Sequence, residues 1–286
     1  MHSLVLKRFA LLLALALCLT GLTVPALAES DKMVVAVTIL PQKALAEAVA
    51  GDLAEVIAMV PAGTSPGNYE PTPMEMEAFS KAKAYFTIGV PTEKANILPS
   101  AKDMAIVDCA AIVAEQYPDR QFSSGSRDPH IWLSPKRAIV MVSAMAAKLG
   151  ELDPDNAATY TANAEVYVAQ LTELDQYMAS AFDGMRKKEF FAYHPAYGYI
   201  ADDYGLTMYS LEEDGKEATP QKLAEMIDLA KAEGIKTIFS QAEIDSKQPD
   251  AFAEEIGGEK VMLAPLSEDY IPNLKSMADA IAGSMA

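Results

Sequence analysis

Residues 153–182 decide the fold, and they read DPDNAATYTANAEVYVAQLTELDQYMASAF. Asp153 is placed to cap a helix that begins at Pro154, because proline favours the first helical position. Apolar residues then recur at steps of three and four, along one face: Tyr160, Ala164, Tyr167, Leu171, Leu174, Met178 and Ala181. About 28 helical residues, at about 1.5 Å each, would span about 40 Å. We therefore predict a rigid helix over residues 153–184 that links two parts of the chain.

Short apolar runs alternate with helical stretches on both sides of this helix. The strands expected before it lie at residues 32–41, 54–61, 84–90 and 104–110, and those expected after it lie at 189–195, 235–241 and 260–266. Strands that alternate with helices favour a parallel sheet with helices on its faces. We predict an α/β fold with two Rossmann-like lobes that contain parallel sheets, an N-terminal lobe over 29–152 and a C-terminal lobe over 185–286.

Residues 1–28 have the parts of a secretory signal peptide. A basic pair, Lys7 and Arg8, precedes an apolar run, and small residues precede the expected cleavage after Ala28. Cys18 is a candidate for lipid attachment, but Leu17 before it is larger than the small residue that a lipobox requires. We therefore favour soluble export, to the periplasm or the outer face of the cytoplasmic membrane.

Charge and cysteine content narrow the class of protein. The formal net charge of −17 argues against nucleic acid or an anionic membrane surface as a partner, and it suits a cationic ligand or simple solubility. Cys109 is the only cysteine outside the predicted signal peptide, so no internal disulfide is available. The run AIVDCAA predicts that Cys109 lies in a buried strand. We expect a monomer stabilised by an ordinary apolar core.

The mature chain has two histidines, one on each side of the predicted linking helix. His194 ends the apolar strand EFFAY, and His130 follows the polar loop DRQFSSGSRD in the stretch RDPHIWLSP. Ligands of open α/β sheets bind beyond the carboxyl ends of strands, and neutral imidazole is a common ligand for zinc. The two histidines are therefore candidate metal ligands, with structural roles as the alternative.

Five stretches occur in an order that is typical of one family: VPAGTSPGNYEPTPMEMEAFSKA at 60–82, DPHIWLSP at 128–135, AYHPAYGYIADDYGL at 192–206, GKEATPQKLAEMIDLAKAEGIKTIFSQ at 215–241 and APLSEDYIPNLKSMADAI at 264–281. The chain resembles the zinc- and manganese-binding solute-binding proteins of bacterial ABC transporters, called cluster A-I. The resemblance implies two lobes joined by a rigid helix, a metal in the cleft between them and delivery to a membrane permease. It also implies that His130 and His194 are metal ligands.

Two positions depart from the family pattern. Gly67 stands in PGNYEP where the family commonly has its first histidine, and Ala264 stands where a late aspartate is common. Two imidazoles are too few for a tight zinc site, since even catalytic zinc normally keeps three protein ligands. The candidates to contact the ligand as well are, in order of preference, Asn68, Gln241 and Glu243, followed by Glu70 and Glu213.

The sequence thus favours an extracytoplasmic carrier that delivers a divalent metal to an ABC importer, with zinc as the first choice of metal and manganese as the second. The alternatives are a protein of the same fold that binds a metal chelate or another small ligand, or an adhesin. An exported metallohydrolase is disfavoured because the chain lacks H-E-x-x-H, G-x-S-x-G and a third mature histidine. We therefore expect a protein that is not an enzyme.

Overall fold

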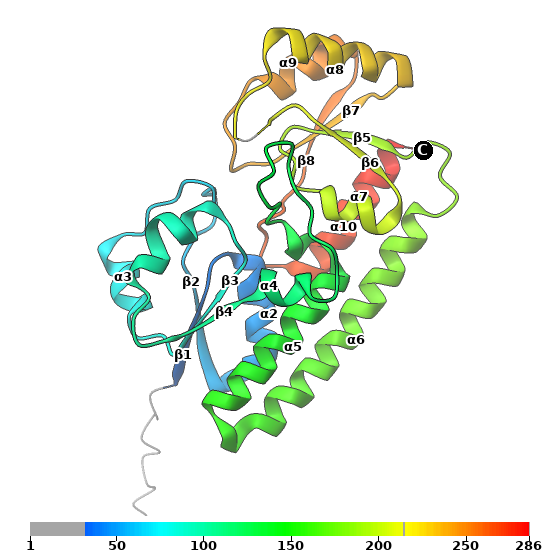
Figure 1. The fold of residues 1–286 in the computed structure, drawn as a ribbon. Coiled ribbons are helices and arrows are strands. Elements are labelled where there is room, and N and C mark those ends of the chain that lie inside the picture. Colours follow the sequence, from blue (N-terminus) through cyan, green and yellow to red (C-terminus); the bar gives the residue numbers. More distant parts are fainter. Residues whose placement is uncertain (1–31, 214, 286) are drawn as a thin grey trace, which may run out of the picture. The chain divides into compact units, whose positions relative to one another are not determined.

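Two parallel β-sheets form the centre of the protein (Figure 1). A computed structural model describes residues 32–213 and 215–285, so the predicted signal peptide and Cys18 lie outside the described residues. The first sheet contains β1 (Met33–Val37), β2 (Ala54–Ala58), β3 (Ala84–Thr87) and β4 (Ala105–Asp108). The second contains β5 (Glu189–Ala192), β6 (Thr207–Ser210), β7 (Thr237–Ser240) and β8 (Glu259–Met262). The predicted α/β class with two parallel sheets is confirmed.

Both sheets have the same strand order. The first runs β2-β1-β3-β4 and the second runs β6-β5-β7-β8, with every neighbouring pair parallel. Val35 on β1 is paired with Val56 on one side and Ala84 on the other, and Phe191 holds the matching position on β5. The order reverses beside the first strand of each sheet. In open α/β sheets, such a reversal leaves a crevice beyond the carboxyl ends of the strands, where ligands bind.

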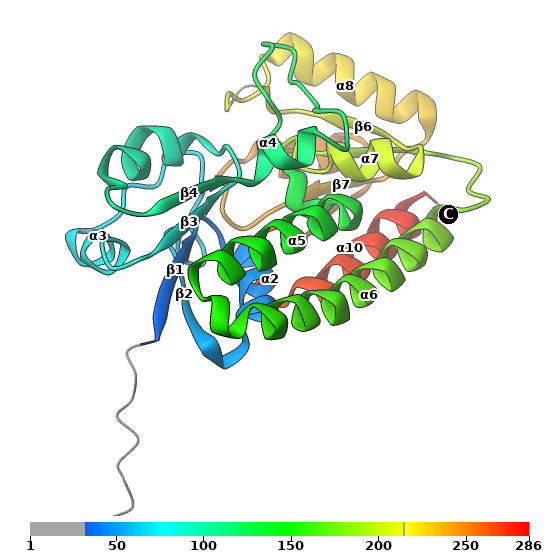
Figure 2. The ribbon, with the colours of Figure 1, turned by 60° about the horizontal axis from the view of Figure 1, so that its bottom comes forward.

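The helices cover the sheets and run between them (Figures 1 and 2). Those of the first half are α2 (Leu40–Ala50), α3 (Pro73–Phe79), α4 (Cys109–Ala114), α5 (Pro135–Leu152) and α6 (Ala157–Phe182). Those of the second half are α7 (Gly198–Tyr204), α8 (Pro220–Glu233), α9 (Gln248–Glu255) and α10 (Tyr270–Ser284). Short turns complete the described chain: η1 (Gly51–Leu53), η2 (Glu93–Ile97), η3 (Leu98–Ser100), η4 (Ile131–Leu133) and η5 (Pro154–Asn156). No helix among the described residues is both long and apolar enough to cross a membrane.

Helix α6 is the long helix that the sequence predicts, and it has 26 residues. It packs against α5 and α2 of the first half and against α10, the last helix of the chain (Figure 2). The buried side chains of α6 are those of Tyr160, Ala164, Leu171, Leu174, Met178 and Phe182. All of them except Phe182 belong to the predicted stripe. The other two residues of that stripe, Tyr167 and Ala181, are only partly buried. The predicted start needs correction, because Pro154 opens the separate turn η5 and Asn156, not Asp153, precedes α6.

Three local features of the structure differ from what the sequence predicts. Cys109 is buried, as expected, but it begins helix α4 instead of continuing a strand. Asp108 causes this change, since its side chain accepts a hydrogen bond from the backbone N–H of Ala111 and so caps the helix. Helix α7 and strand β6 were not predicted, because their few residues have no clear apolar period. Strand β6 is identified by its pairing with β5, and α7 by its packing in the tertiary structure.

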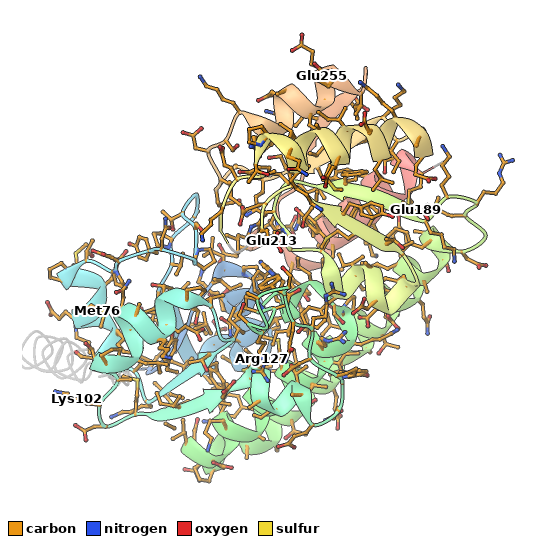
Figure 3. All side chains as sticks on the ribbon, turned by 45° about the horizontal axis from the view of Figure 1, so that its top comes forward. Met76, Lys102, Arg127, Glu189, Glu213 and Glu255 are labelled. Atoms are coloured by element: carbon orange, nitrogen blue, oxygen red, sulfur yellow. The ribbon has the colours of Figure 1, made fainter. Side chains whose placement is uncertain are left out.

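Charged side chains lie mainly at the surface, and apolar side chains lie mainly in the interior. Exposed charged groups such as Glu255 extend outward from the ribbon in Figure 3. The main apolar cluster runs from β1 through α2, α5 and α6 to α10, so it is shared by both halves of the chain. Packing of α6 is therefore expected to determine much of the stability.

We expect Leu171→Ala to lower the free energy of unfolding by about 2–5 kcal/mol, because the fully buried Leu171 would leave a cavity beneath α6. Val166→Ala on the exposed face of the same helix is the matched control, and we expect a change within about 0.5 kcal/mol. Urea denaturation of both variants measures the difference. Equal stability of the two variants would contradict the assigned role of the buried stripe.

Candidate metal centre

A cleft of about 760 Å³ lies where the carboxyl ends of the strands of both sheets meet. Its walls come from the segments that follow β2, β3, β5, β6, β7 and β8, together with the loop between α4 and η4. The strand reversals of both sheets predict a crevice at this position. The polar lining residues on which the following geometry depends are Asn68, His130, His194, Glu212, Gln241 and Glu243.

His130 is held rigidly at the start of η4. The Asp128 Oδ1 atom accepts a hydrogen bond from His130 Nδ1 at 2.7 Å and another from the His130 backbone N–H at 3.0 Å. Asp128 is 1% exposed and His130 is 7% exposed. The ring of Trp132 lies beside the imidazole, with centroids 5.1 Å apart. The carboxylate and the indole thus fix both the tautomer and the direction of the imidazole, which leaves Nε2 free to face the cleft.

His194 follows β5 and has a carboxylate partner of its own. Its Nδ1 donates to the Glu212 Oε1 atom at 2.9 Å. The backbone brings the two residues together, because the N–H of Glu212 donates to the carbonyl of Tyr193 at 2.9 Å. Glu212 is buried, at 7% exposed. Each imidazole therefore donates its Nδ1 proton to a buried carboxylate, the arrangement by which proteins orient metal-binding histidines.

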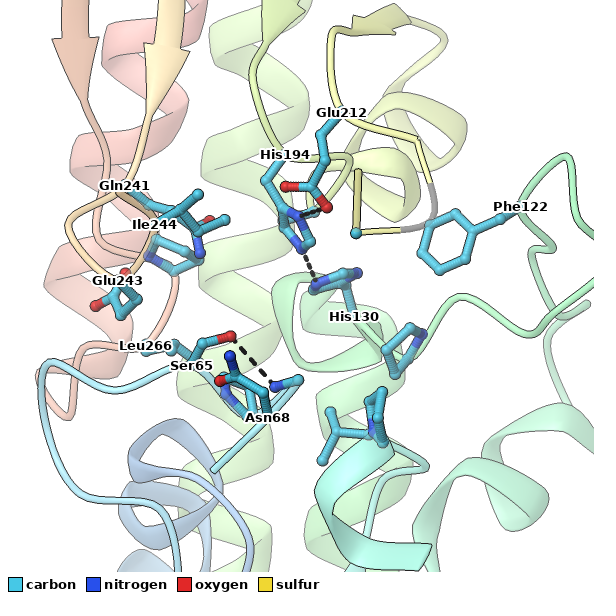
Figure 4. Close-up of a pocket in the computed structure, with 18 of the residues that line it drawn as sticks. Ser65, Asn68, Phe122, His130, His194, Glu212, Gln241, Glu243, Ile244 and Leu266 are labelled. Atoms are coloured by element: carbon cyan, nitrogen blue, oxygen red, sulfur yellow. Dashed lines mark hydrogen bonds and ion pairs between the residues drawn. The ribbon is translucent and has the colours of Figure 1, made fainter. Parts of the chain in front are cut away.

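The two Nε2 atoms face one another across the cleft at 3.2 Å (Figure 4). A neutral imidazole that donates its Nδ1 proton to a carboxylate has a lone pair at Nε2, and two such lone pairs make no hydrogen bond with each other. Two nitrogens bound tetrahedrally to zinc, each about 2.0–2.1 Å from the ion, lie about 3.3 Å apart. The observed separation thus matches that of two ligands of a tetrahedral ion, and a cation between the rings would satisfy both lone pairs.

Burial governs the charge of His130. It lowers the pKa of His130 from its ordinary value, and the hydrogen bond and the charge of Asp128 oppose this effect. The neutral form, which is the form that binds metal, is thereby favoured at neutral pH. The sequence singled out His130 and His194 as candidate ligands, and the structure brings them together although 64 residues separate them in the chain.

The other candidates lie on the walls of the same cleft (Figure 4). Gln241 is 7% exposed, and its Oε1 atom is buried without a hydrogen-bond partner. The Oε2 atom of Glu243, on the same wall, is also buried without a partner. Asn68 is exposed on another wall, beside Ser65. Buried polar atoms normally have a partner, so the two oxygens on the β7 side mark a surface built to meet a ligand.

Two weaker candidates do not contribute to the lining. Glu70 is exposed and lies outside the cleft. Glu213 also lies outside it, and its carboxylate accepts a hydrogen bond from the Ser123 hydroxyl instead. The sequence interpretation missed the two carboxylates that orient the imidazoles. Asp128 had a usable signal, because it stands two residues before His130, whereas Glu212 is revealed only by the pairing of β6 with β5.

The described residues present a pair of imidazoles, not a complete coordination shell. Within residues 32–213 and 215–285, no three His, Cys, Asp or Glu side chains are grouped so as to hold a metal ion. Gly67 lines the cleft without a side chain to contribute. Ala264 does not line the cleft, and its backbone carbonyl accepts a hydrogen bond from Asn273 at 2.8 Å. Neither Gly67 nor Ala264 therefore provides a side-chain donor to the cleft.

Comparison with known proteins assigns the chain to a family. A family model described as "Zinc-uptake complex component A periplasmic" matches residues 35–284. The chain belongs to this family. The match covers both sheets and all the helices named above, so it is not limited to a local motif. The family consists of non-enzymatic solute-binding proteins for transport outside the cytoplasm, which confirms the predicted class and the predicted export.

Individual relatives agree with this assignment. The high-affinity zinc uptake system protein ZnuA of Bacillus subtilis is 27% identical over 283 residues, which cover 90% of this chain and 89% of the relative. A crystal structure of ZnuA is 33% identical with a TM-score of 0.84 and covers 90% of this chain and all of that one. A ZnuA deletion mutant with zinc bound is also 33% identical, with a TM-score of 0.83 over 90% of this chain and 99% of that one.

We expect Glu212→Gln to weaken zinc binding by about 10- to 100-fold, because His194 loses the negative charge that orients and polarises its ring. Glu213→Gln is the matched control, since it removes the same charge from the next residue, outside the cleft. We expect it to change the Kd by less than about threefold. Calorimetric titration of both variants with zinc measures the effect, and equal losses of affinity would contradict the role assigned to Glu212.

Proposed function

We propose that this protein captures one zinc ion between His130 and His194 and passes it to the permease of an ABC importer. The observation that carries the proposal is the 3.2 Å separation of the two Nε2 atoms, each on a ring that a buried carboxylate orients. Zinc is the cargo, and no reaction is performed on it. Imidazole donors suit zinc better than manganese, which prefers oxygen, so manganese is the second choice.

Oxygen donors on the cleft walls are proposed to complete the surroundings of the ion. Gln241 and Glu243 have buried oxygens without partners, and both face the cavity that contains the imidazole pair. Asn68 offers an amide on a different wall, in the loop that contains Gly67. These donors contact the ion directly or through its remaining water molecules, which donate hydrogen bonds to unpaired acceptors. A shift of the walls toward the ion brings them closer to it.

A monomer is sufficient for this function. Both imidazoles and both orienting carboxylates come from one chain, so the site needs no residue from a second copy. The family assignment supports an ABC importer as the acceptor of the cargo. We propose that its permease contacts the surface around the cleft, where residues from both halves of the chain lie side by side.

We expect His130→Ala and His194→Ala each to weaken zinc binding by well over tenfold, because each leaves the ion with a single imidazole. Elemental analysis of the purified mature protein, followed by titration with zinc and manganese, measures the effect. Circular dichroism of both variants without metal controls for folding. Retained affinity in both variants would refute the proposed function.

We expect Glu243→Gln to weaken zinc binding by about three- to tenfold, since the variant removes a negative charge whose Oε2 atom is buried in the cleft wall. Asp245→Asn is the matched control, because it removes the same charge from an exposed residue of the same wall. We expect a change of less than about twofold in that control. Competition against a zinc-sensitive dye measures both values, and a similar loss in both variants would assign the effect to charge alone.

A further inference from the structure

We propose that Arg120 is a positioning residue for the metal site, and that Gly198 makes room for it. This inference rests on the proposed function, because it concerns how His130 is held ready for zinc. The Arg120 guanidinium lies behind Asp128, on the side away from His130. Its Nε atom is 3.4 Å from Asp128 Oδ2, whereas Asp128 Oδ1 accepts from His130. Arg120 therefore acts on His130 through the carboxylate and does not touch the ion.

Asp128 takes its polar partners from the protein, because it is buried. Its carboxylate is 1% exposed, and a buried polar group without a partner is costly. The 3.4 Å contact with Arg120 supplies the opposite charge without hydrogen-bond geometry, since Arg120 Nε has no hydrogen-bond partner. The two oxygens of the carboxylate are thus divided between two tasks. One oxygen faces the guanidinium, and the other remains available to the His130 ring.

The backbone places Arg120 and Asp128 side by side. The N–H of Asp128 donates to the carbonyl of Arg120 at 2.9 Å, which closes the loop between them. The Tyr199 hydroxyl accepts from the N–H of Arg120 at 3.1 Å and donates to the carbonyl of Asp128 at 2.9 Å. Arg120 also pairs with Asp202, at 2.5 Å from Nη1 to Oδ1. Tyr199 and Asp202 of α7 therefore hold both ends of the loop between Arg120 and Asp128, which precedes His130.

Gly198 is the residue that permits this arrangement. A Cβ atom at Gly198 would lie 2.3 Å from Arg120 Nε and 2.7 Å from Cζ, which is closer than any real contact of this kind. The guanidinium occupies the space that a side chain would take. Because the clash is with the end of a flexible side chain, alanine would displace Arg120 while leaving its charge and the fold in place. Gly198→Ala therefore tests the effect of moving the guanidinium, whereas a substitution of Arg120 tests the effect of removing it.

Three variants test the inference by calorimetric titration of the full mature chain with zinc. We expect Arg120→Gln and Gly198→Ala each to weaken binding by about tenfold, as for other groups that orient a ligand from outside the coordination shell. Arg186→Gln is the control, because it removes the same charge from an exposed residue that does not line the cleft. We expect that control to change the Kd by less than about threefold.

A double-mutant cycle distinguishes positioning from a general structural role. If Arg120 acts through Asp128, then Arg120→Gln has no further effect in an Asp128→Asn background. Visible absorption of bound Co²⁺, which reports the geometry around the ion, is expected to change in Arg120→Gln and Gly198→Ala but not in Arg186→Gln. The inference is overturned if Arg120→Gln and Gly198→Ala both bind zinc as the wild type does, or if the loss is equal in both backgrounds. Failure of the wild type to bind zinc would instead refute the proposed function.

Discussion

The buried stripe of α6 is the constraint on which the rest of the structure depends. This helix packs against α5 and α2 beside the first sheet and against α10, which follows the second sheet. A single apolar cluster therefore extends through both halves of the chain. With the helix held on both sides, the carboxyl ends of the two sheets meet at one cleft. The pair of facing imidazoles is a consequence of that packing, because among the described residues each half contributes one histidine.

A second set of contacts joins His130 to the C-terminal half. The indole N–H of Trp132 donates to the carbonyl of Pro265 at 2.8 Å, and the Tyr270 hydroxyl donates to the carbonyl of Trp132. The turn η4, which begins after His130, is thereby tied to the segment before α10. With Asp128 and Arg120 behind the ring, His130 is held from several directions. Support of this kind holds the ring in one orientation before anything binds, which lowers the entropic cost of binding.

The cleft combines the framework of the family with a smaller set of candidate ligands. Membership of the zinc-uptake family is established over nearly all the described residues, and the two imidazoles have the separation that a tetrahedral ion requires. Gly67 and Ala264 nevertheless provide no side-chain donor at two positions where the family commonly has one. The unpaired oxygens of Gln241 and Glu243 lie in the segment after β7, which is paired with β8, the strand that precedes Ala264. These oxygens are the basis of the proposal that donors from this segment take the place of the missing side chains.

The sequence by itself determined the α/β class, the long helix and the two candidate imidazoles. Each of these has a local signal, in the period of apolar residues or in a motif of a few residues. Tertiary structure alone decided that Glu212 orients His194, because the pairing of β6 with β5 sets that contact and β6 has no clear pattern. It likewise decided that Arg120 lies over Gly198, since 78 residues separate them. Local propensity fixes which elements form, whereas the direction of a side chain in a cleft depends on packing between distant segments.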